Sequence, residues 1–287
     1  MAITIGSNIT SLTAQRRLGA STDSLNKVFQ RLSSGQRINS AADDAAGLTI
    51  ADSLRASQKV SGIGMRNASD GLSYIGIADG AMAEVGNVLN RLAELAQQSS
   101  NGVYSPTQRS ALQGEFASLS SEIERISATT IFNDVVLLSG GAATSLQVGF
   151  DGRSTAQISI GNVQATLTAL GLAGSGSSVQ IYSLNAVSSD AGQSASRAAL
   201  DAVNRAIGSL SATRGALGAV ESRLRVSIGN LSTIRENYAA AESRIRDTDV
   251  ASDAAELTRL NILQQAGASI LGQANQQPQI ALGLLRG

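Results

Sequence analysis

The sequence predicts a mainly α-helical protein, an elongated antiparallel helical bundle or coiled coil with a small β-hairpin element and with its N- and C-termini paired. Three observations predict this class. Apolar residues recur at alternating intervals of three and four over long stretches, which is typical of helices that pack along a seam. Both chain ends carry the same pattern, and the middle of the chain replaces it with a Gly- and Ser-rich hairpin signal.

The N-terminal segment carries the first apolar stripe. Its members recur with the spacing of a helix face: Ala14, Leu18, Ser21, Leu25, Val28 and Leu32. A short amphipathic end cannot build a dry core alone. We therefore expect this stripe to pair with the C-terminal end and with other copies of the chain.

An acidic pair follows in the run NSAADDAAGL. The adjacent carboxylates of Asp43 and Asp44 would point about 100° apart on a helix, which is unsuitable for paired acid–base chemistry. Asn39 and Ser40 instead predict a helix start, with the two acidic residues in its first turn.

A helical hairpin is predicted next. Two heptad-patterned segments, one through Val85, Val88, Leu92 and Leu95 and one through Leu112, Phe116, Leu119, Ile123 and Ile126, flank a break. The break is SSNGVYSPTQ (99–108), which contains the Gly, Asn, Ser and Pro that end helices and turn the chain.

The middle of the chain differs in composition. SLQVGFDGRSTAQISIG (145–161) alternates apolar and polar residues around Asp151-Gly152, which predicts a β-hairpin. Residues 171–196 are rich in Gly and Ser and are expected to form a surface loop with one short strand at 179–182.

The C-terminal third returns to the heptad pattern. Nine positions from Leu200 to Tyr238 keep one register and predict one long helix. A last stripe consists of Leu260, Leu263, Gly267, Ile270 and Ala274, and it is the expected partner of the N-terminal stripe.

Composition excludes most catalytic chemistry. The 287 residues include no His, no Cys and no Trp, so there is no imidazole or thiolate for nucleophilic catalysis or metal binding. No enzyme activity, metal or cofactor is expected. A net charge of zero and scattered aromatic residues argue against nucleic-acid binding, and no segment has the roughly 20 apolar residues of a membrane span.

Two segments carry a distinctive pattern: RLSSGQRINSAADDAAGLTIADSLRA (31–56), with SNITSLTAQRRL upstream, and RIRDTDVASDAAELTRLNILQQAGASILGQANQQPQIALGLLRG (244–287). They resemble the bacterial flagellin family. The resemblance implies a structural subunit that assembles into the flagellar filament for swimming and lies outside the cell. It also implies contacts with an export chaperone, the filament cap and hook-junction proteins. Because the N-terminus has no signal-peptide pattern, we expect export unfolded through the flagellar type III system, with the N-terminus intact.

The resemblance also implies a domain plan. Residues 1–42 and 247–287 would form a terminal helical polymer-core domain, residues 43–140 and 197–246 a rod-like helical domain, and residues 141–196 the β-hairpin and a short variable surface loop. The residues expected at the polymer interface are Leu12, Leu18, Leu25, Phe29, Leu32, Leu260, Leu263, Ile270, Leu284 and Leu285.

One further segment, NRLAELAQQSSNG (90–102), resembles the patch of many flagellins that a host Toll-like receptor reads. Arg91, Leu95 and Glu115 match its key positions. Two other functions stay open at this point: a hook–filament junction protein, which shares the terminal helical architecture, and a secreted membrane-active helical protein. The mixed charges along the helices argue against the second.

Overall fold

The computed structural model describes residues 7–174, 180–186 and 188–286; for residues 189 and 278–286 it describes the backbone alone. The chain divides into two compact units. Unit 1 comprises residues 1–58 and 236–287, and unit 2 comprises residues 59–235. The divisions fall within helices α2 (Ala45–Ser99) and α4 (Ser189–Arg246).

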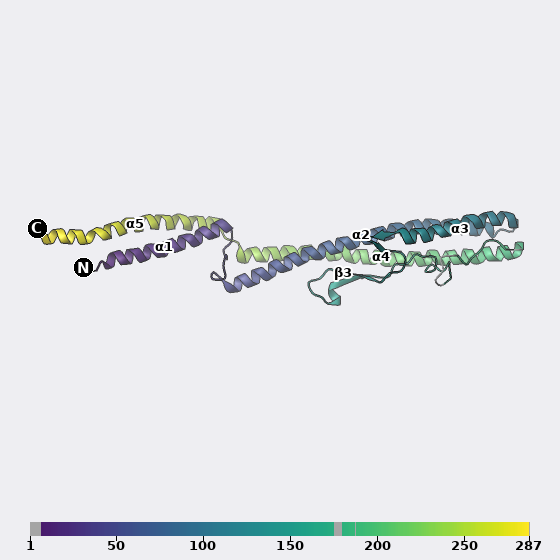
Figure 1. Cartoon of the computed structure of the whole chain (residues 1–287), viewed down its shortest axis with the longest axis horizontal. Coiled ribbons are helices and arrows are strands. Elements are labelled where there is room, and N and C mark those ends of the chain that lie inside the picture. The colour runs from purple at the N-terminus through teal and green to yellow at the C-terminus, as the bar shows by residue number, and fades with distance from the viewer. Residues whose placement is uncertain (1–6, 175–179, 187, 287) are drawn as a thin grey trace. The chain divides into compact units, whose positions relative to one another are not determined.

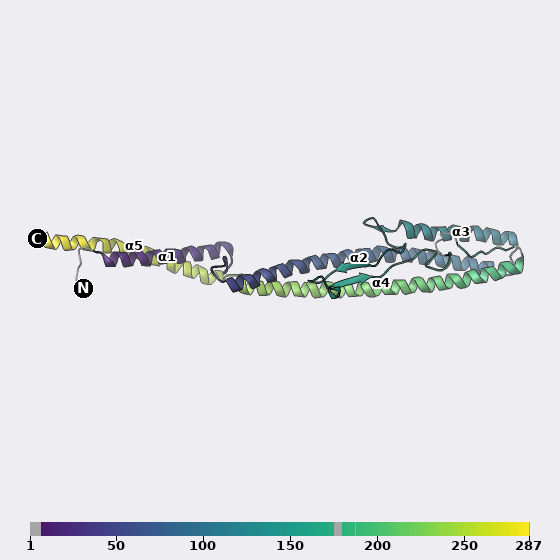
Figure 2. The same ribbon diagram turned by 60° about the horizontal axis from the view of Figure 1, so that its bottom comes forward.

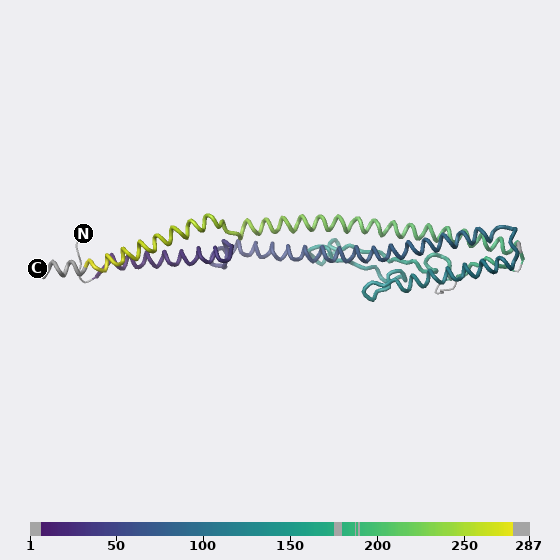
Figure 3. Tube along the Cα trace, turned by 90° about the horizontal axis from the view of Figure 1, so that it is seen from above, coloured from purple at the N-terminus to yellow at the C-terminus, as the bar shows by residue number. Residues whose placement is uncertain are grey.

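Two terminal helices form most of unit 1. Helix α1 (Ile9–Ser34) and helix α5 (Val250–Arg286) lie side by side and antiparallel (Figures 1 and 3). The Asn8 side chain caps the start of α1 by accepting from the Ser11 N–H at 3.0 Å. Gly35 ends α1 in the left-handed conformation at φ 69°, which glycine adopts without steric cost. The predicted pairing of the two chain ends is confirmed.

The predicted start of α2 at Asn39 and Ser40 is wrong. Residues 37–44 form turns, and α2 begins at Ala45. Asp44 is the capping residue, because its carboxylate accepts from the Gly47 N–H at 2.9 Å. A β-carbon on Gly47 would lie 2.4 Å from that carboxylate, so only glycine leaves room for the cap.

Unit 2 contains α3 (Pro106–Thr129), which lies beside α2, while α4 lies along the other side of α2 (Figure 2). The predicted helical hairpin is confirmed. Ser105 and Gln108 exchange side-chain-to-backbone bonds in a capping box, and Pro106 follows at the first helical position, where its missing N–H costs nothing. The predicted C-terminal helix is also confirmed and is longer than the pattern indicated.

The core of unit 2 follows the predicted seams. Completely buried side chains from all three helices meet there; they include Val85, Leu89, Leu92, Leu95, Phe116, Ile123, Val203 and Leu224. The heptad positions of α2, α3 and α4 are therefore occupied by intrachain contacts.

Two small hairpins accompany the helices. Strands β1 (Ile131–Phe132) and β2 (Val135–Val136) are joined by Asn133 and Asp134, both at positive φ (48° and 62°), as a two-residue turn of the primed type requires. Strands β3 (Thr144–Gln147) and β4 (Gln157–Ile160) form the predicted hairpin. Its tip is not a tight Asp151-Gly152 turn, since residues 148–156 separate the strands and include the 3₁₀ turn Ser154–Ala156.

Strand β3 lies against α2 where two glycines occur seven residues apart. A β-carbon on Gly64 would lie 2.7 Å from the carbonyl oxygen of Val148, and one on Gly71 would lie 2.2 Å from a methyl of Leu146. Between them, the Asn67 amide donates to the Gln147 carbonyl at 2.8 Å. The two glycines thus make room for the hairpin, and Asn67 fixes its register.

The prediction of a surface loop at 171–196 is wrong in two respects. Leu172, Ala173 and Leu184 are buried in the core of unit 2, and α4 begins at Ser189. The expected strand at 179–182 falls partly outside the described residues; within them, Gln180 forms one isolated bridge with Ala173. The described residues between 171 and 186 are irregular chain with several side chains in the core, and the high Gly and Ser content of the segment gave no sign of this. The fold class itself is confirmed: mainly α, antiparallel, with a small hairpin.

Candidate functional site: the terminal helix pair

Unit 1 exposes large apolar side chains that its own helices do not cover. Eight such residues have exposed fractions between 46% and 64%: Ile9, Leu12, Phe29, Ile50, Val250, Ile262, Leu263 and Ile270. We call these eight the exposed apolar set. Exposed apolar side chains are candidates for a surface that another protein covers where they lie next to one another.

The seam between α1 and α5 uses other residues. On α1, Val28 is buried, and Ala14, Leu18, Leu25 and Leu32 are half-buried. On α5, Leu260 and Ala274 are buried, and Gly267 lies between them, where a β-carbon would sit 3.3 Å from a methyl of Leu18. Intrachain packing therefore already holds Leu18, Leu25, Leu32 and Leu260, four of the residues predicted for contacts between copies.

Leu263 and Ile270 were predicted to share the stripe with Leu260, and that placement is wrong. They are 46% and 57% exposed, because the α5 seam passes through Leu260, Gly267 and Ala274 while these two residues project beside it. Leu12 and Phe29, both 63% exposed, do the same on α1. Leu284 and Leu285 lie in the last turns of α5, and their side chains fall outside the described residues.

A shallow apolar groove crosses the pair near the start of α1. It has a volume of about 380 Å³ and lies between residues of both helices: Ile9, Thr13, Ala14 and Arg17 from α1, and Gly267 and Ile270 from α5. Ala14 has a small side chain and Gly267 has none, so neither residue fills this space between the helices. Ile9 and Ile270, both from the exposed apolar set, form its apolar walls.

Polar contacts hold the register of the pair at both ends. The Asn8 amide donates to the Ala274 carbonyl at 2.7 Å, and the guanidinium of Arg31 meets the carboxylate of Asp253 at 3.0 Å. Because polar contacts along a seam are satisfied in one register only, they specify which residues of α1 and α5 face outward.

The connections beyond these helices are joined to each other. Gln36 and Asp247 form an antiparallel bridge, and the Arg37 backbone N–H donates to the Arg246 carbonyl at 2.6 Å. The Arg37 guanidinium also donates to the Ile245 carbonyl at 2.6 Å, near the C-terminal end of α4, where carbonyls lack helical partners. These bonds hold the loop after α1 against the break between α4 and α5.

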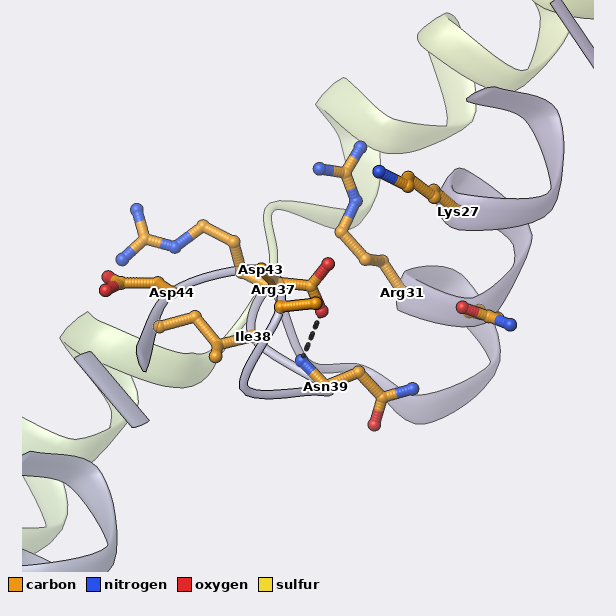
Figure 4. A pocket seen from close by; sticks show the side chains of 9 residues that line it. Lys27, Arg31, Arg37, Ile38, Asn39, Asp43 and Asp44 are labelled. Atoms are coloured by element: carbon orange, nitrogen blue, oxygen red, sulfur yellow. Dashed lines mark hydrogen bonds between the residues drawn. The ribbon is translucent and has the colours of Figure 1, made fainter. Parts of the chain in front are cut away.

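A second hollow, of about 420 Å³, lies beside this loop (Figure 4). Two carboxylates line it, and one of them, Asp43, accepts from the backbone N–H groups of Asn39 and Ser40 and from the Ser40 hydroxyl. The bonds from Ser40 hold the pKa of Asp43 below its usual value, and the nearby Lys27 lowers it further. A carboxylate kept ionised and bonded to its own turn stabilises that turn and is poorly suited to proton transfer.

The residues that match the receptor patch do not share one surface. Leu95 is completely buried, so it is a core residue of unit 2. Arg91 and Glu115 are exposed and pair with each other across α2 and α3 at 2.7 Å, and Arg91 also meets Glu94 at 2.9 Å. These carboxylates raise the pKa of Arg91, with the bond from Glu94 the larger contribution.

Among the described residues no group of three His, Cys, Asp or Glu side chains is arranged to hold a metal ion. None of the described helices combines the length and the apolar character needed to cross a membrane. The sequence interpretation missed four members of the exposed apolar set: Ile9, Ile50, Val250 and Ile262. Their signal was an apolar residue outside the heptad positions of a helix whose seam was already assigned.

Comparison with known proteins agrees with this arrangement. Residues 5–143 match the bacterial flagellin N-terminal helical region, and residues 200–285 match the bacterial flagellin C-terminal helical region. The chain is 40% identical over 283 residues to a flagellin of Halalkalibacterium halodurans, covering 98% of this chain and 99% of that protein. A flagellin of Bacillus subtilis is 38% identical over 302 residues, with 98% and 99% coverage.

Among solved structures, a putative flagellar hook-associated protein from Vibrio parahaemolyticus has a similar fold. The TM-score is 0.59 at 14% identity, covering 71% of this chain and all of that one. At so low an identity the likeness shows a shared fold alone. The two family regions and the full-length relatives carry the assignment: the chain belongs to the bacterial flagellin family.

Proposed function

We propose that this chain is a structural subunit of the bacterial flagellar filament, which assembles with copies of itself into the extracellular flagellum used for swimming. The relatives named flagellin extend over nearly the whole chain. The observation on this structure that carries the proposal is the exposed apolar set: seven of its eight members lie on the terminal helix pair, and Ile50 lies near the start of α2. Its members would be covered by neighbouring copies in a polymer.

Assembly through this surface has a simple physical basis. Burying apolar surface contributes roughly 25 cal/mol per Å², and fully covering one Leu or Ile side chain contributes about 1.5–3 kcal/mol. Of the predicted interface residues, we assign Leu12, Phe29, Leu263 and Ile270 to contacts between copies. We assign Leu18, Leu25, Leu32 and Leu260 to holding the pair in shape.

The test compares two surface variants that leave the seam intact. Replacing both Leu263 and Ile270 with Ser should prevent filament formation, because each is about half exposed and its apolar contacts form in the polymer. Replacing Val103 with Ser is the matched control, since Val103 is 85% exposed at the turn between α2 and α3. Sedimentation and electron microscopy measure the result. Normal filaments from the double variant would contradict the assignment.

We also propose the domain plan given by the family resemblance. In it, residues 1–42 and 247–287 form the polymer core, residues 43–140 and 197–246 the rod, and residues 141–196 the hairpin and outer segment. One compact unit of the chain, residues 1–58 and 236–287, combines its N- and C-terminal segments, which supports this plan, although the unit extends further along the chain than the planned polymer core.

The resemblance further supports a set of partners and a route. We propose export in an unfolded state through the flagellar type III system, with contacts to an export chaperone, the filament cap and hook-junction proteins. We propose no catalytic role, consistent with a sequence that has neither His nor Cys. Nucleic acid and membrane are not expected as partners of this chain, because its basic and acidic residues are interspersed and its net charge is zero.

Recognition by a host Toll-like receptor is proposed for the Arg91 and Glu115 pair, without direct contact from buried Leu95. Exchanging the two charges, Arg91→Glu with Glu115→Arg, keeps an opposite-charge pair between α2 and α3 while inverting the charge pattern presented outside. We expect receptor signalling by soluble monomer to fall strongly. The unfolding midpoint should be monitored alongside, and an unchanged dose response with an intact fold would reject the site.

The hook–filament junction alternative is not favoured by any feature of this chain, since the hook-associated likeness extends to the fold alone. Counting copies separates the two functions. A filament subunit is the main component of the filament, whereas a junction protein is confined to its base.

A further inference from the structure

The groove on the terminal helix pair is an apolar surface that a side chain from a second copy of this chain can cover. The walls Ile9 and Ile270 are 64% and 57% exposed, so the groove presents apolar surface to solvent in the isolated chain. Its volume of about 380 Å³ is large enough for a bulky side chain. This inference rests on the proposed assembly of the chain with copies of itself.

Phe29 is the strongest candidate among the exposed apolar set. It is the only Phe in unit 1, it is 63% exposed, and the seam uses Val28 and Leu32 beside it. A buried aromatic ring contributes more contact area than an aliphatic side chain and commonly anchors protein interfaces.

Arg17 favours an aromatic occupant over Ile262 or Leu263. Its exposed side chain lines the groove, and among the described residues it has no ion-pair partner within 4.0 Å. A guanidinium beside an aromatic ring is attracted by the negative face of the ring, whereas an aliphatic side chain offers it nothing. The groove therefore combines apolar walls for a ring with a cation for the ring's face.

The positions of the two features suit an open polymer. Both lie on α1, and Thr13 in the groove is 16 residues from Phe29, or about 24 Å along a helix at 1.5 Å per residue. Phe29 and the groove lie at different places on one chain, so a contact between them joins unlike surfaces of two copies. Such a heterologous contact can repeat from copy to copy and build an open filament in place of a closed ring. We propose that Phe29 of one copy inserts into the groove of the next, with neighbouring copies displaced by about 24 Å along α1.

Cysteine cross-linking tests this contact cleanly, because the natural sequence has no Cys. A chain with Phe29→Cys is mixed with a chain carrying Thr13→Cys, assembled and oxidised. A disulfide needs Cα atoms within about 7 Å, so a covalent dimer of the two chains reports insertion. The matched control replaces Thr13→Cys by Gln15→Cys, because Gln15 lies at nearly the same level of α1 but about 200° around the helix.

The expected result is a mixed dimer with the Thr13 variant and little with the Gln15 variant. Filaments that form without the Thr13 cross-link, or with equal cross-linking at both positions, overturn the insertion of Phe29 and leave the filament function standing. If the unmodified chain forms no filaments, the proposed function itself fails.

The Phe29→Cys variant could assemble poorly because it lacks the ring, so a second experiment measures the critical concentration for assembly of other variants. Thr13→Phe places a ring from the same copy into the groove, so that Phe29 of the next copy cannot enter. Gln15→Phe adds a ring on the side of α1 away from the groove and is the control. We expect Phe29→Ala and Thr13→Phe each to raise the critical concentration for assembly by about a hundredfold, in line with losing one buried aromatic contact. Their effects should not add, since both remove the same contact. Full additivity, or an equal effect of Gln15→Phe, would overturn the proposal.

Discussion

At the scale of single residues, Arg109 shows how a charged side chain can belong to a core. It is 1% exposed, and its guanidinium donates to the carbonyls of Ser99 at 2.9 Å and Asn101 at 3.0 Å. These carbonyls lie at the C-terminal end of α2, where backbone acceptors lack helical partners and a cation is favoured. The sequence did not predict this role, because an Arg in the first turn of a helix is usually exposed.

The first prediction concerns this residue. Arg109→Met should lower the free energy of unfolding by about 1–3 kcal/mol, because the carbonyl of buried Ser99 loses its donor. Arg109→Lys should cost less, since an ammonium keeps the charge and can still donate to one of these carbonyls. Urea denaturation followed by circular dichroism measures both variants, and an unchanged midpoint for Arg109→Met would count against the capping role.

The second prediction concerns pH. The bond from Arg214, at 2.7 Å, holds the pKa of Asp79 below its ordinary value. A carboxyl whose pKa is lower in the folded chain stabilises the fold above its unfolded pKa, and this contribution is lost as pH falls through the folded value. Both side chains are about 40% exposed, so the contribution at neutral pH should be under about 1 kcal/mol.

Asp79→Asn should therefore be slightly less stable than the natural chain at neutral pH, and the difference should shrink as pH falls below the ordinary Asp pKa of about 3.9 and through the lower folded value. Asp70→Asn, which alters an exposed carboxylate on the same helix, is the control and should show no such convergence. Denaturation midpoints at several pH values measure the difference. A gap between Asp79→Asn and the natural chain that persists in acid would contradict the account.

At the scale of elements, the helices could be predicted from the sequence because a packed seam requires an apolar side chain at every turn. The pattern through Leu200 and Leu224, for example, predicted one helix that the structure contains. The β1–β2 hairpin was missed although Asn133-Asp134 is a recognisable turn signal, since strands of two residues show no alternation. The buried coil at Leu172 and Leu184 had no periodicity at all, because its contacts are set by the helices around it.

The candidate site was predictable in part for the same reason. The stripes identified the terminal helices as a pair, but periodicity alone did not separate the inward face of α5 from the outward face. Leu260 and Leu263 both fit a spacing of three and four, and the register set by Asn8 and the Arg31–Asp253 contact decides between them. Such polar contacts between distant segments are not visible in one sequence.

The third prediction tests the docking of β3 on α2. Gly64→Ala should lower stability by about 1–3 kcal/mol, because the added methyl would meet the Val148 carbonyl at 2.7 Å and push the hairpin away. Gly62→Ala is the matched control on the same helix, with open space around its β-carbon, and should raise stability by up to about 1 kcal/mol. Thermal melts of both variants give the comparison. Equal melting temperatures would show that the hairpin does not depend on this close approach.

At the scale of the whole molecule, the two units differ in how completely they bury their apolar side chains. Unit 2 has a large buried core from three helices and the coil around them. Unit 1 has one seam, which contains Ser, Ala and Gly, and leaves the exposed apolar set uncovered. Ordering a helix costs about 1–2 kcal/mol per residue in backbone entropy, so a pair with so little burial gains much of its stability from further contacts. We therefore expect α1 and α5 to be mobile in dilute monomer and ordered on assembly.

The most direct test of that claim removes one partner of the pair. A chain lacking residues 250–287 loses α5 but keeps the core of unit 2. Sedimentation and electron microscopy, combined with thermal melts followed by circular dichroism, would be applied to this chain and to the full-length protein under the same assembly conditions. We predict that the full-length protein forms long filaments, whereas the shortened chain stays monomeric and retains a cooperative helical melt. Long filaments from the shortened chain would contradict the claim that the paired terminal helices form the core of the polymer.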